Sequence, residues 1–326
     1  MKRIKDVRIV FMGTPAFALP SLRALHQKGF NIQAVVTQPD RPRGRGRRPR
    51  PSPVKELAQS LGLVVLQPEK ASAPEFIHEV RAMNPDFLVV AAYGQILKQQ
   101  LLDVPAIMPV NVHGSLLPKW RGAAPIQRAI LHGEAKTGIT IMKMDAGMDT
   151  GPILLKEETP IREDDTFGTL HDRLADMGAR LLIQALLGIL DGRIHPVPQP
   201  DHGATYAPPV AKEELEIRWQ DPALLIHRKI RSLDPVPGAF TYLEGQRIRV
   251  YSPRFVDTSK LDQTPGPCTD SSPGTVVGVT GNLLLVATGD GILGLEEIHL
   301  PGKKRMKIGE FLRGHTLKKG MILGNE

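Results

Sequence analysis

The chain has 326 residues, of which 41% are hydrophobic and 23% are charged. That length predicts about two globular domains, because one domain usually spans roughly 100–200 residues. The single cysteine, Cys268, excludes an internal disulfide and a paired-cysteine metal site, which fits a reducing, cytoplasmic compartment. No apolar run approaches the roughly 20 residues of a membrane helix, so we expect no membrane partner.

The formal net charge of +8 comes mainly from one short stretch. The arginines of this stretch are Arg41, Arg43, Arg45, Arg47, Arg48 and Arg50. Without these six residues the net charge would fall from +8 to +2. Basic character concentrated at one place predicts a polyanionic partner that is met there.

The first two hundred residues alternate short apolar runs with helical patterns. The run at 7–12 follows a basic start but is too short for a signal peptide, so we interpret it as the first strand. Further strands are predicted at 32–37, 63–66, 87–92, 110–113, 138–144 and 152–156. Helices are predicted at 16–28, 54–60, 74–83, 126–131 and 168–190. This alternation predicts an α/β domain at 1–192, with a doubly wound (Rossmann-like), mostly parallel sheet.

The pattern changes after a proline-rich stretch at 193–211, which is typical of a linker. A helix is predicted at 223–233. Short β runs follow at 239–243, 246–251, 274–279, 283–287 and 291–300, separated by hairpin signals such as Gly281-Asn282. Several short antiparallel strands predict a second domain at 212–326, a small β-barrel of the OB type.

Several enzyme classes lack their signatures in this sequence. The turn after the first strand is Gly13-Thr14-Pro15 and not Gly-x-Gly-x-x-Gly, so the nicotinamide fingerprint is missing. There is no Walker phosphate loop and no His-Glu-x-x-His motif. We therefore expect neither a nucleoside triphosphatase nor a metal enzyme.

An amide and an imidazole lie two residues apart near the end of the strand at 110–113. Residues two apart on a strand share a side, so Asn111 and His113 are presented together while Val112 points into the core. Donors held at the carboxyl edge of such a sheet can stabilise the oxyanion of an acyl transfer, and histidine can move a proton near neutral pH. A lone Asn-x-His pair is more often structural, so both interpretations stay open at this point.

Two loops add chemistry to this pair. A turn at 145–151 carries Asp145 and Asp149, and a carboxylate there could orient the histidine, although turn formation alone would also explain it. The arginine-rich loop at 40–51 contains no acidic residue after Asp40. It is either a solvated loop or a phosphate-binding one, since guanidinium groups bind phosphate bidentately. In the second case it predicts a nucleic-acid substrate.

Longer motifs connect these features. They are Phe11-Met-Gly-Thr-Pro15, Thr37-Gln-Pro-Asp-Arg-Pro42, Ala92-Tyr-Gly-Gln-Ile96, Asn111-Val-His-Gly-Ser-Leu-Leu-Pro118, Trp120-Arg-Gly-Ala-Ala-Pro-Ile-Gln127 and Thr140-Ile-Met-Lys-Met-Asp-Ala-Gly-Met-Asp-Thr-Gly151. Together they resemble the methionyl-tRNA formyltransferases, a branch of the folate-dependent formyltransferase superfamily. The resemblance spans roughly residues 8 to 312.

The resemblance implies an activity and roles for residues. The formyl donor would be 10-formyltetrahydrofolate, and the acceptor would be the α-amino group of initiator methionyl-tRNA. Asn111, His113 and Asp149 would be catalytic. The folate-binding residues would be Ser115, Leu116, Leu117, Pro118, Tyr93 and Gly94, and the tRNA-binding residues Arg41, Arg43, Arg45, Arg47 and Arg48. The first domain would be catalytic, the barrel would bind tRNA, and we expect a monomer without a metal.

The sequence departs from the family in two ways. Val236 stands between two prolines where the family often has tryptophan, which puts an aromatic contact there in doubt. The loop at 40–51 is also richer in arginine than is common. Two alternatives remain: a folate-dependent formyltransferase acting on a sugar nucleotide or a purine precursor, which would not need this loop, and a non-catalytic RNA-binding protein, which would not need the Asn-His-Asp set.

Overall fold

The computed structural model describes residues 2–42, 49–200, 202–256 and 271–324, which form two compact units. The first unit contains Met1–Pro125, Lys136–Pro160 and His171–Ala207, and the second contains Ile126–Ala135, Ile161–Leu170 and Pro208–Glu326. Much of the stretch that we interpret as a linker, up to Ala207, is thus part of the first unit. Cys268 lies outside the described residues.

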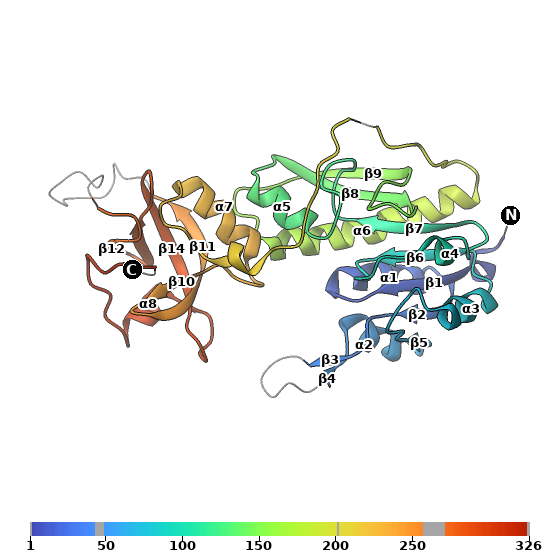
Figure 1. The fold of residues 1–326 in the computed structure, drawn as a ribbon, viewed down its shortest axis with the longest axis horizontal. Coiled ribbons are helices and arrows are strands. Elements are labelled where there is room, and N and C mark those ends of the chain that lie inside the picture. Colours follow the sequence, from blue (N-terminus) through green and yellow to red (C-terminus); the bar gives the residue numbers. More distant parts are fainter. Residues whose placement is uncertain (1, 43–48, 201, 257–270, 325–326) are drawn as a thin grey trace. The chain divides into compact units, whose positions relative to one another are not determined.

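A seven-stranded sheet forms the centre of the first unit (Figure 1). Its strands, in spatial order, are β5 (Val65–Leu66), β2 (Asn31–Val36), β1 (Arg8–Gly13), β6 (Phe87–Ala91), β7 (Met108–His113), β8 (Lys136–Lys143) and β9 (Ile153–Pro160). Strands β5 to β7 run parallel, whereas β8 and β9 are antiparallel to their neighbours. Every residue of β6 and β7 is buried, as expected for strands covered on both faces. The predicted mostly parallel sheet is confirmed.

Most helices up to residue 190 follow the predicted pattern, but α4 was not expected. The helices are α1 (Leu19–Gln27), α2 (Pro53–Ser60), α3 (Pro74–Ala82), α4 (Gln99–Leu102), α5 (Pro125–Leu131), which belongs mainly to the second unit, and α6 (Phe167–Leu190), with short 3-10 turns at Ile4–Asp6 and Ala16–Ala18. Helix α2 begins as a capped helix should, because Ser52 Oγ accepts a hydrogen bond of 3.0 Å from the amide of Lys55. A short hairpin, β3 (Arg41–Pro42) with β4 (Pro49–Arg50), was not expected.

Close packing of α6 against the sheet fixes which way β7 faces. A Cβ atom on Gly178 of α6 would lie 2.8 Å from Cγ1 of Val112, so only glycine lets the helix come this near. Val112 therefore faces α6. Because side chains alternate along a strand, Asn111 and His113 face the opposite side of the sheet, as predicted.

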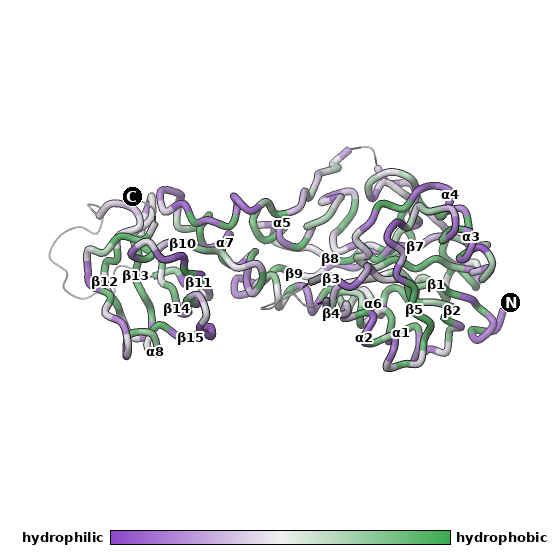
Figure 2. The backbone as a smooth tube through the Cα atoms, turned by 60° about the horizontal axis from the view of Figure 1, so that its bottom comes forward, coloured by the Kyte–Doolittle hydropathy of each residue, from purple (hydrophilic) through white to green (hydrophobic). Residues whose placement is uncertain are grey.

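The second unit is an antiparallel sheet with helices beside it. Its elements are a 3-10 turn at Lys212–Leu215, α7 (Ala223–Leu233), β10 (Phe240–Leu243), β11 (Gln246–Phe255), β12 (Val276–Thr280), β13 (Leu283–Ala287), β14 (Ile292–His299), β15 (Met306–Lys307) and α8 (Ile308–Leu312). The strand order is β10-β11-β14-β13-β12, with β15 beside β14. In Figure 2 the apolar colouring marks β1 in the first unit and β13 in the second. The bounds of α7 and β13 agree with the prediction to the residue.

A short segment near residue 323 joins the two edges of this sheet. The amide of Leu323 donates to the carbonyl of Gly274 at 2.8 Å, and the amide of Gly324 donates to the carbonyl of Tyr242 at 2.9 Å. The first bond reaches the edge at β12 and the second reaches the edge at β10. Leu323 itself is 2% exposed and packs in the core with Trp219. The sheet thereby closes into a small barrel, which confirms that expectation.

Within the described ranges, none of the helices combines the length and the apolarity that a membrane crossing requires.

Candidate active site

The strand order creates a topological switch beside β1. The chain runs from β1 outward to β2 and β5, and then returns to β6 on the other side of β1. Ligands of doubly wound folds bind at the carboxyl ends of the strands at such a point. Thr14, which follows β1, connects the loops after β2 and β6. Its hydroxyl donates to the carbonyl of Tyr93 at 2.8 Å and accepts a hydrogen bond from the amide of Gln38 at 3.3 Å.

Asn111 and His113 lie at the carboxyl end of β7, the strand next to β6. Their exposed fractions are 9% and 5%, so both polar side chains are largely removed from water. Buried polar groups are held by hydrogen bonds, and the partners of these two side chains define the site.

Asp149 is the partner that both side chains share. Its Oδ1 accepts a hydrogen bond of 3.3 Å from Nδ2 of Asn111. Its Oδ2 accepts the amide of Gly122 at 2.8 Å and lies 3.6 Å from Nδ1 of His113. The backbone of Asp149 is left-handed, with φ of 53°. The structure therefore brings together the three residues that the resemblance marked as catalytic.

The other ring nitrogen of His113 also faces an oxygen. Its Nε2 lies 3.0 Å from the carbonyl oxygen of Trp120. A proton on either ring nitrogen thus has an oxygen to face, the Trp120 carbonyl on one side and the Asp149 carboxylate on the other. The two oxygens thereby hold the ring in one orientation.

Asp145, the other carboxylate of the turn, has a local role. Its Oδ1 accepts the amide of Gly147 at 3.1 Å and the hydroxyl of Thr150 at 2.7 Å. These bonds close the turn on itself in the usual manner of aspartate in loops. Of the two turn carboxylates, only Asp149 is hydrogen-bonded to Asn111.

The segment Ser115 to Pro118 follows β7 after Gly114 and is hydrogen-bonded to Thr140 of β8. Ser115 and Leu117 have exposed fractions of 0%. The carbonyl of Ser115 accepts the hydroxyl of Thr140 at 2.7 Å, and the amide of Leu117 donates to the same hydroxyl at 3.0 Å. Leu116 and Pro118 are half-buried. The backbone of the segment is therefore fixed, and Leu116 and Pro118 each expose part of their surface.

Tyr93 and Gly94 follow β6. The side chain of Tyr93 points into the apolar core and is 2% exposed, and burial raises the pKa of its phenol to about 12. This phenol is therefore neutral and is not an acid or base near neutral pH. Gly94 is exposed and has φ of 92°, a conformation that favours glycine. Both residues can act at the site through their backbone.

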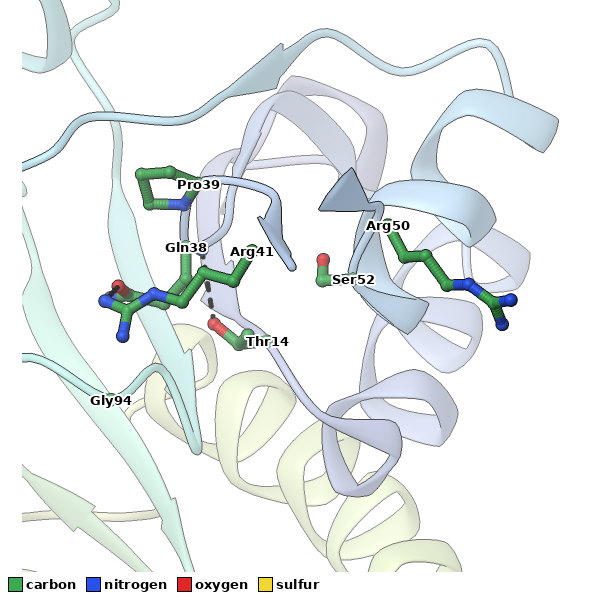
Figure 3. A pocket seen from close by; sticks show the side chains of 7 residues that line it. All are labelled: Thr14, Gln38, Pro39, Arg41, Arg50, Ser52 and Gly94. Atoms are coloured by element: carbon green, nitrogen blue, oxygen red, sulfur yellow. Dashed lines mark hydrogen bonds between the residues drawn. The ribbon is translucent and has the colours of Figure 1, made fainter. Parts of the chain in front are cut away.

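The hairpin β3–β4 borders a pocket of about 210 Å³ at the same edge of the sheet. The pocket is lined by Thr14, Gln38, Pro39, Arg41, Arg50, Ser52 and Gly94 (Figure 3). The side chains of Arg41 and Arg50 leave the hairpin in opposite directions in this view. The remaining residues of the arginine set, Arg43, Arg45, Arg47 and Arg48, lie outside the described residues.

One contact of Asp149 had no signal in the sequence. The side chain of Gln199 donates to the main-chain carbonyl of Asp149 at 2.7 Å and accepts hydrogen bonds from Arg121. Gln199 belongs to the stretch that reads as a linker because it is rich in proline and polar residues. An amide that binds backbone carbonyls leaves no motif, so sequence analysis did not find it.

Among the residues that the structure describes, no group of three or more histidine, cysteine, aspartate or glutamate side chains could hold a metal ion.

Two described families and several named proteins match this chain. Residues 7–186 match the family described as "Formyl transferase", and residues 209–316 match "Formyl transferase, C-terminal domain". The chain is 48% identical to "Methionyl-tRNA formyltransferase" of Pelobacter propionicus, over 97% of this chain and 96% of that one. It is 47% identical to "Methionyl-tRNA formyltransferase" of Acetivibrio thermocellus, over 98% of this chain and 100% of that one.

A solved structure shares the fold at lower identity. It is the N-formyltransferase from Helicobacter canadensis in complex with folinic acid and dTDP-3-aminofucose, with a TM-score of 0.61 and 17% identity over 89% of this chain and 98% of that one. The family descriptions and the close relatives, which extend over nearly the whole sequence, lead to one assignment. The chain belongs to the formyl transferase family.

Proposed function

We propose that this chain transfers the formyl group of 10-formyltetrahydrofolate to the α-amino group of methionine on initiator methionyl-tRNA, which yields formylmethionyl-tRNA for translation initiation. The observation that carries the proposal is the convergence of Asn111, His113 and Asp149 at the carboxyl edge of the sheet. The relatives that share 47–48% identity over nearly the full length are named methionyl-tRNA formyltransferase.

The reaction forms one carbon–nitrogen bond and breaks another. The α-amino nitrogen attacks the formyl carbon, the bond from that carbon to N10 of the folate breaks, the amine loses a proton and N10 gains one. Negative charge develops on the formyl oxygen during the attack. The second N–H of the Asn111 amide, which Asp149 does not use, is one donor that stabilises this charge. The N–H of His113 at Nε2 becomes the other when the formyl oxygen replaces the Trp120 carbonyl as its acceptor.

Asp149 supports both donors in this mechanism. Its carboxylate fixes the Asn111 amide through Oδ1 and faces the His113 ring through Oδ2. A carboxylate beside an imidazole holds its orientation and stabilises its protonated form as the proton moves. Asp149 therefore assists the proton transfer from the attacking amine through His113.

The folate donor fits the segments beside these groups. Thr14 holds the carbonyl of Tyr93, which precedes the exposed Gly94, and Thr140 holds the segment from Ser115 to Pro118. Rigid backbone groups suit a flat, hydrogen-bonding ring such as a pterin, since they need no rearrangement on binding. The Helicobacter canadensis enzyme of the same fold was solved with folinic acid.

The basic loop supports tRNA as the acceptor. Arg41 borders the pocket at the site edge, next to Arg43, Arg45, Arg47 and Arg48 in the sequence. Arginines in this number neutralise phosphates and position a nucleic acid without reading its bases. The close relatives, at 47–48% identity over nearly the full length, are named methionyl-tRNA formyltransferase, which supports the same substrate over a small-molecule amine. We assign tRNA binding to that barrel, and we place the protein in the cytoplasm as a monomer.

One assay tests the proposal. The protein is incubated with 10-formyltetrahydrofolate and charged initiator tRNA, and formylmethionine is measured after hydrolysis of the ester. Charged elongator methionine tRNA and an amino-sugar nucleotide serve as competing acceptors. We expect formylation of the initiator tRNA above both. Formylation of the amino-sugar nucleotide alone would replace this proposal with the small-molecule alternative.

A further inference from the structure

Residues 197–207, here called the strap, lie against the site although they follow α6 in the chain (residue 201 lies outside the described residues). At one end, Val197 pairs with Ile153 of β9 through two hydrogen bonds of 2.7 and 2.8 Å. At the other end, the carbonyl of Thr205 accepts the amide of Arg121 at 2.9 Å, and the amide of Ala207 donates to the carbonyl of Arg121 at 2.7 Å. The strap is therefore hydrogen-bonded at one end to β9, which begins shortly after Asp149. At the other end it is hydrogen-bonded to Arg121, which directly precedes Gly122.

Gln199 of the strap uses its whole side-chain amide within this region. Its Nε2 donates to the carbonyls of Asp149 at 2.7 Å and Gly151 at 2.8 Å. Its Oε1 accepts from Nε and Nη2 of Arg121 at 3.2 and 2.6 Å. An amide has two donor hydrogens and two acceptor lone pairs, so these four bonds use its full capacity. A side chain satisfied in this way has one orientation.

Asp149 needs such support because its backbone is left-handed. With φ of 53° it adopts a conformation that costs a non-glycine residue free energy and persists when neighbouring groups hold it. Gln199 binds the main-chain carbonyl of this residue, while Gly122 and Asn111 bind its carboxylate. The main-chain bond thus sets the turn from which the carboxylate reaches the histidine.

The strap also reaches the second oxygen that faces His113. Trp120, whose carbonyl lies 3.0 Å from Nε2 of His113, has φ of 61° and is left-handed like Asp149. Its amide donates to the hydroxyl of Thr205 at 2.9 Å. Both oxygens that face the imidazole therefore belong to left-handed residues whose backbone is hydrogen-bonded by the strap.

We infer that Gln199, oriented by Arg121, is a positioning residue for catalysis. It holds the Asp149 turn so that the carboxylate faces His113 and Asn111 before substrate arrives. Gln199 and Arg121 act through Asp149 and require no contact with substrate. The inference rests on the proposed function for its kinetic test, whereas the contacts themselves are independent of it.

Gln199→Met tests the inference because it keeps the length of the side chain and removes all four hydrogen bonds. We expect kcat to fall about 10–100-fold, because small misplacement of a catalytic group costs this much, while the KM values for tRNA and folate change less than about twofold. Arg121→Met should give a smaller loss of kcat, and Arg121→Lys should restore part of it, since an ammonium can still donate to Oε1. Matched controls are Gln99→Met and Arg180→Met, whose native side chains bond to Asp103 and Glu157 instead.

A double-mutant cycle separates positioning from mere stability. If Gln199 acts through Asp149, the variant carrying Gln199→Met and Asp149→Asn should be no slower than Asp149→Asn alone, within about threefold. A loss of kcat that adds fully to that of Asp149→Asn would overturn the inference, as would a kcat for Gln199→Met within twofold of the wild-type value. If Gln199→Met lowers Tm strongly, Gln199→Glu is used in the cycle, because it keeps an acceptor for Arg121 and loses both donors.

A substrate-free measurement distinguishes this inference from the proposed function. The ring resonances of His113 report on its hydrogen bonds, and they should move in Gln199→Met in the same direction as in Asp149→Asn. Unchanged resonances would overturn the inference even in an active enzyme. Inactivity of the wild-type protein with methionyl-tRNA would overturn the proposed function and leave this measurement valid.

Discussion

The Oδ2 atom of Asp149 lies 3.6 Å from Nδ1 of His113, and the same oxygen accepts the amide of Gly122 at 2.8 Å. The backbone amide thus fixes the carboxylate independently of the histidine. The ring of His113 meets an acceptor that is already oriented, as the proposed proton transfer through His113 requires.

Asp149→Asn should leave the fold intact and lower kcat about 1,000-fold or more, because an amide keeps the shape and loses the charge that supports the imidazole. Rapid-quench measurement of formyl transfer gives the rate, and thermal melting gives the control for folding. A folded and fully active variant would mean that Asp149 is only a turn residue.

His113→Ala and Asn111→Ala should each lower kcat about 100–1000-fold, since each removes one donor to the developing oxyanion. Folate affinity should change little, because the proposed folate contacts are made mainly by the backbone of neighbouring segments. Titration of folate fluorescence alongside turnover separates the two effects. Near-normal turnover in either variant would remove that residue from the mechanism.

Replacing Arg41, Arg43, Arg45, Arg47 and Arg48 with alanine should raise the KM for tRNA and leave the KM for folate unchanged. The slope of log affinity against log salt should also become shallower, by about one unit or less for each lost phosphate contact. Filter binding at several salt concentrations provides the slope. An unchanged slope together with unchanged tRNA kinetics would make the loop a solvated spacer.

We expect His227 to make the second unit sensitive to acid. Burial, with the nearby charge of Arg231 as a smaller cause, lowers the pKa of His227 from 6.5 to about 4, and the ring stacks on Phe255 at 4.3 Å. As the pH falls from 6.5 to 4, the unfolded chain takes up a proton that the folded unit does not, so stability decreases by roughly 3 kcal/mol in total. Above pH 6.5 this contribution is constant.

His227→Leu should therefore flatten the loss of stability between pH 6.5 and pH 4. Urea unfolding is followed by tryptophan fluorescence, in which the buried Trp219 reports on the second unit and Trp120 on the first. His26→Leu, at an exposed position in α1, is the matched control and should leave the slope as it is. An equal slope in wild type and His227→Leu would contradict the assignment of the acid sensitivity.

Leu323→Ala should destabilise the barrel by about 2–5 kcal/mol, because Leu323 is 2% exposed and its removal leaves a cavity at the seam. Its neighbour provides the control, since Ile322 is 55% exposed and Ile322→Ala should have little effect. The difference in urea midpoint between the two variants is the measurement. Similar midpoints would show that the seam near residue 323 contributes little to the core.

Much of the fold could be predicted because its signals are periodic and local. The helix α7 has apolar residues at helical spacing, and the strand β13 is an apolar run between two turn signals, so their bounds were readable. Asn111 and His113 were found because their spacing on a strand fixes a shared side. Their link to Asp149 came from the resemblance, since no local pattern measures the distance between a strand and a turn.

Other features of the fold and the site could not be predicted from the sequence, for physical reasons. The hairpin β3–β4 contains arginine and proline in place of the apolar alternation that marks a strand. Gln199 and Thr205 bind backbone groups far away in the sequence, and backbone groups are the same in every residue. The composition of their segment therefore indicated a linker, whereas its hydrogen bonds make it part of the first unit.

The strap limits how short a fragment that carries this site can be. A fragment of residues 1–192 would keep Asn111, His113 and Asp149, together with the strands that carry them. It would lose the partners of the Asp149 carbonyl and of the Trp120 amide, which lie at Gln199 and Thr205. Its two left-handed residues would then lose these hydrogen bonds, and the three proposed catalytic side chains would be present without the contacts that position them. A transplantable version of the site therefore has to extend through Ala207.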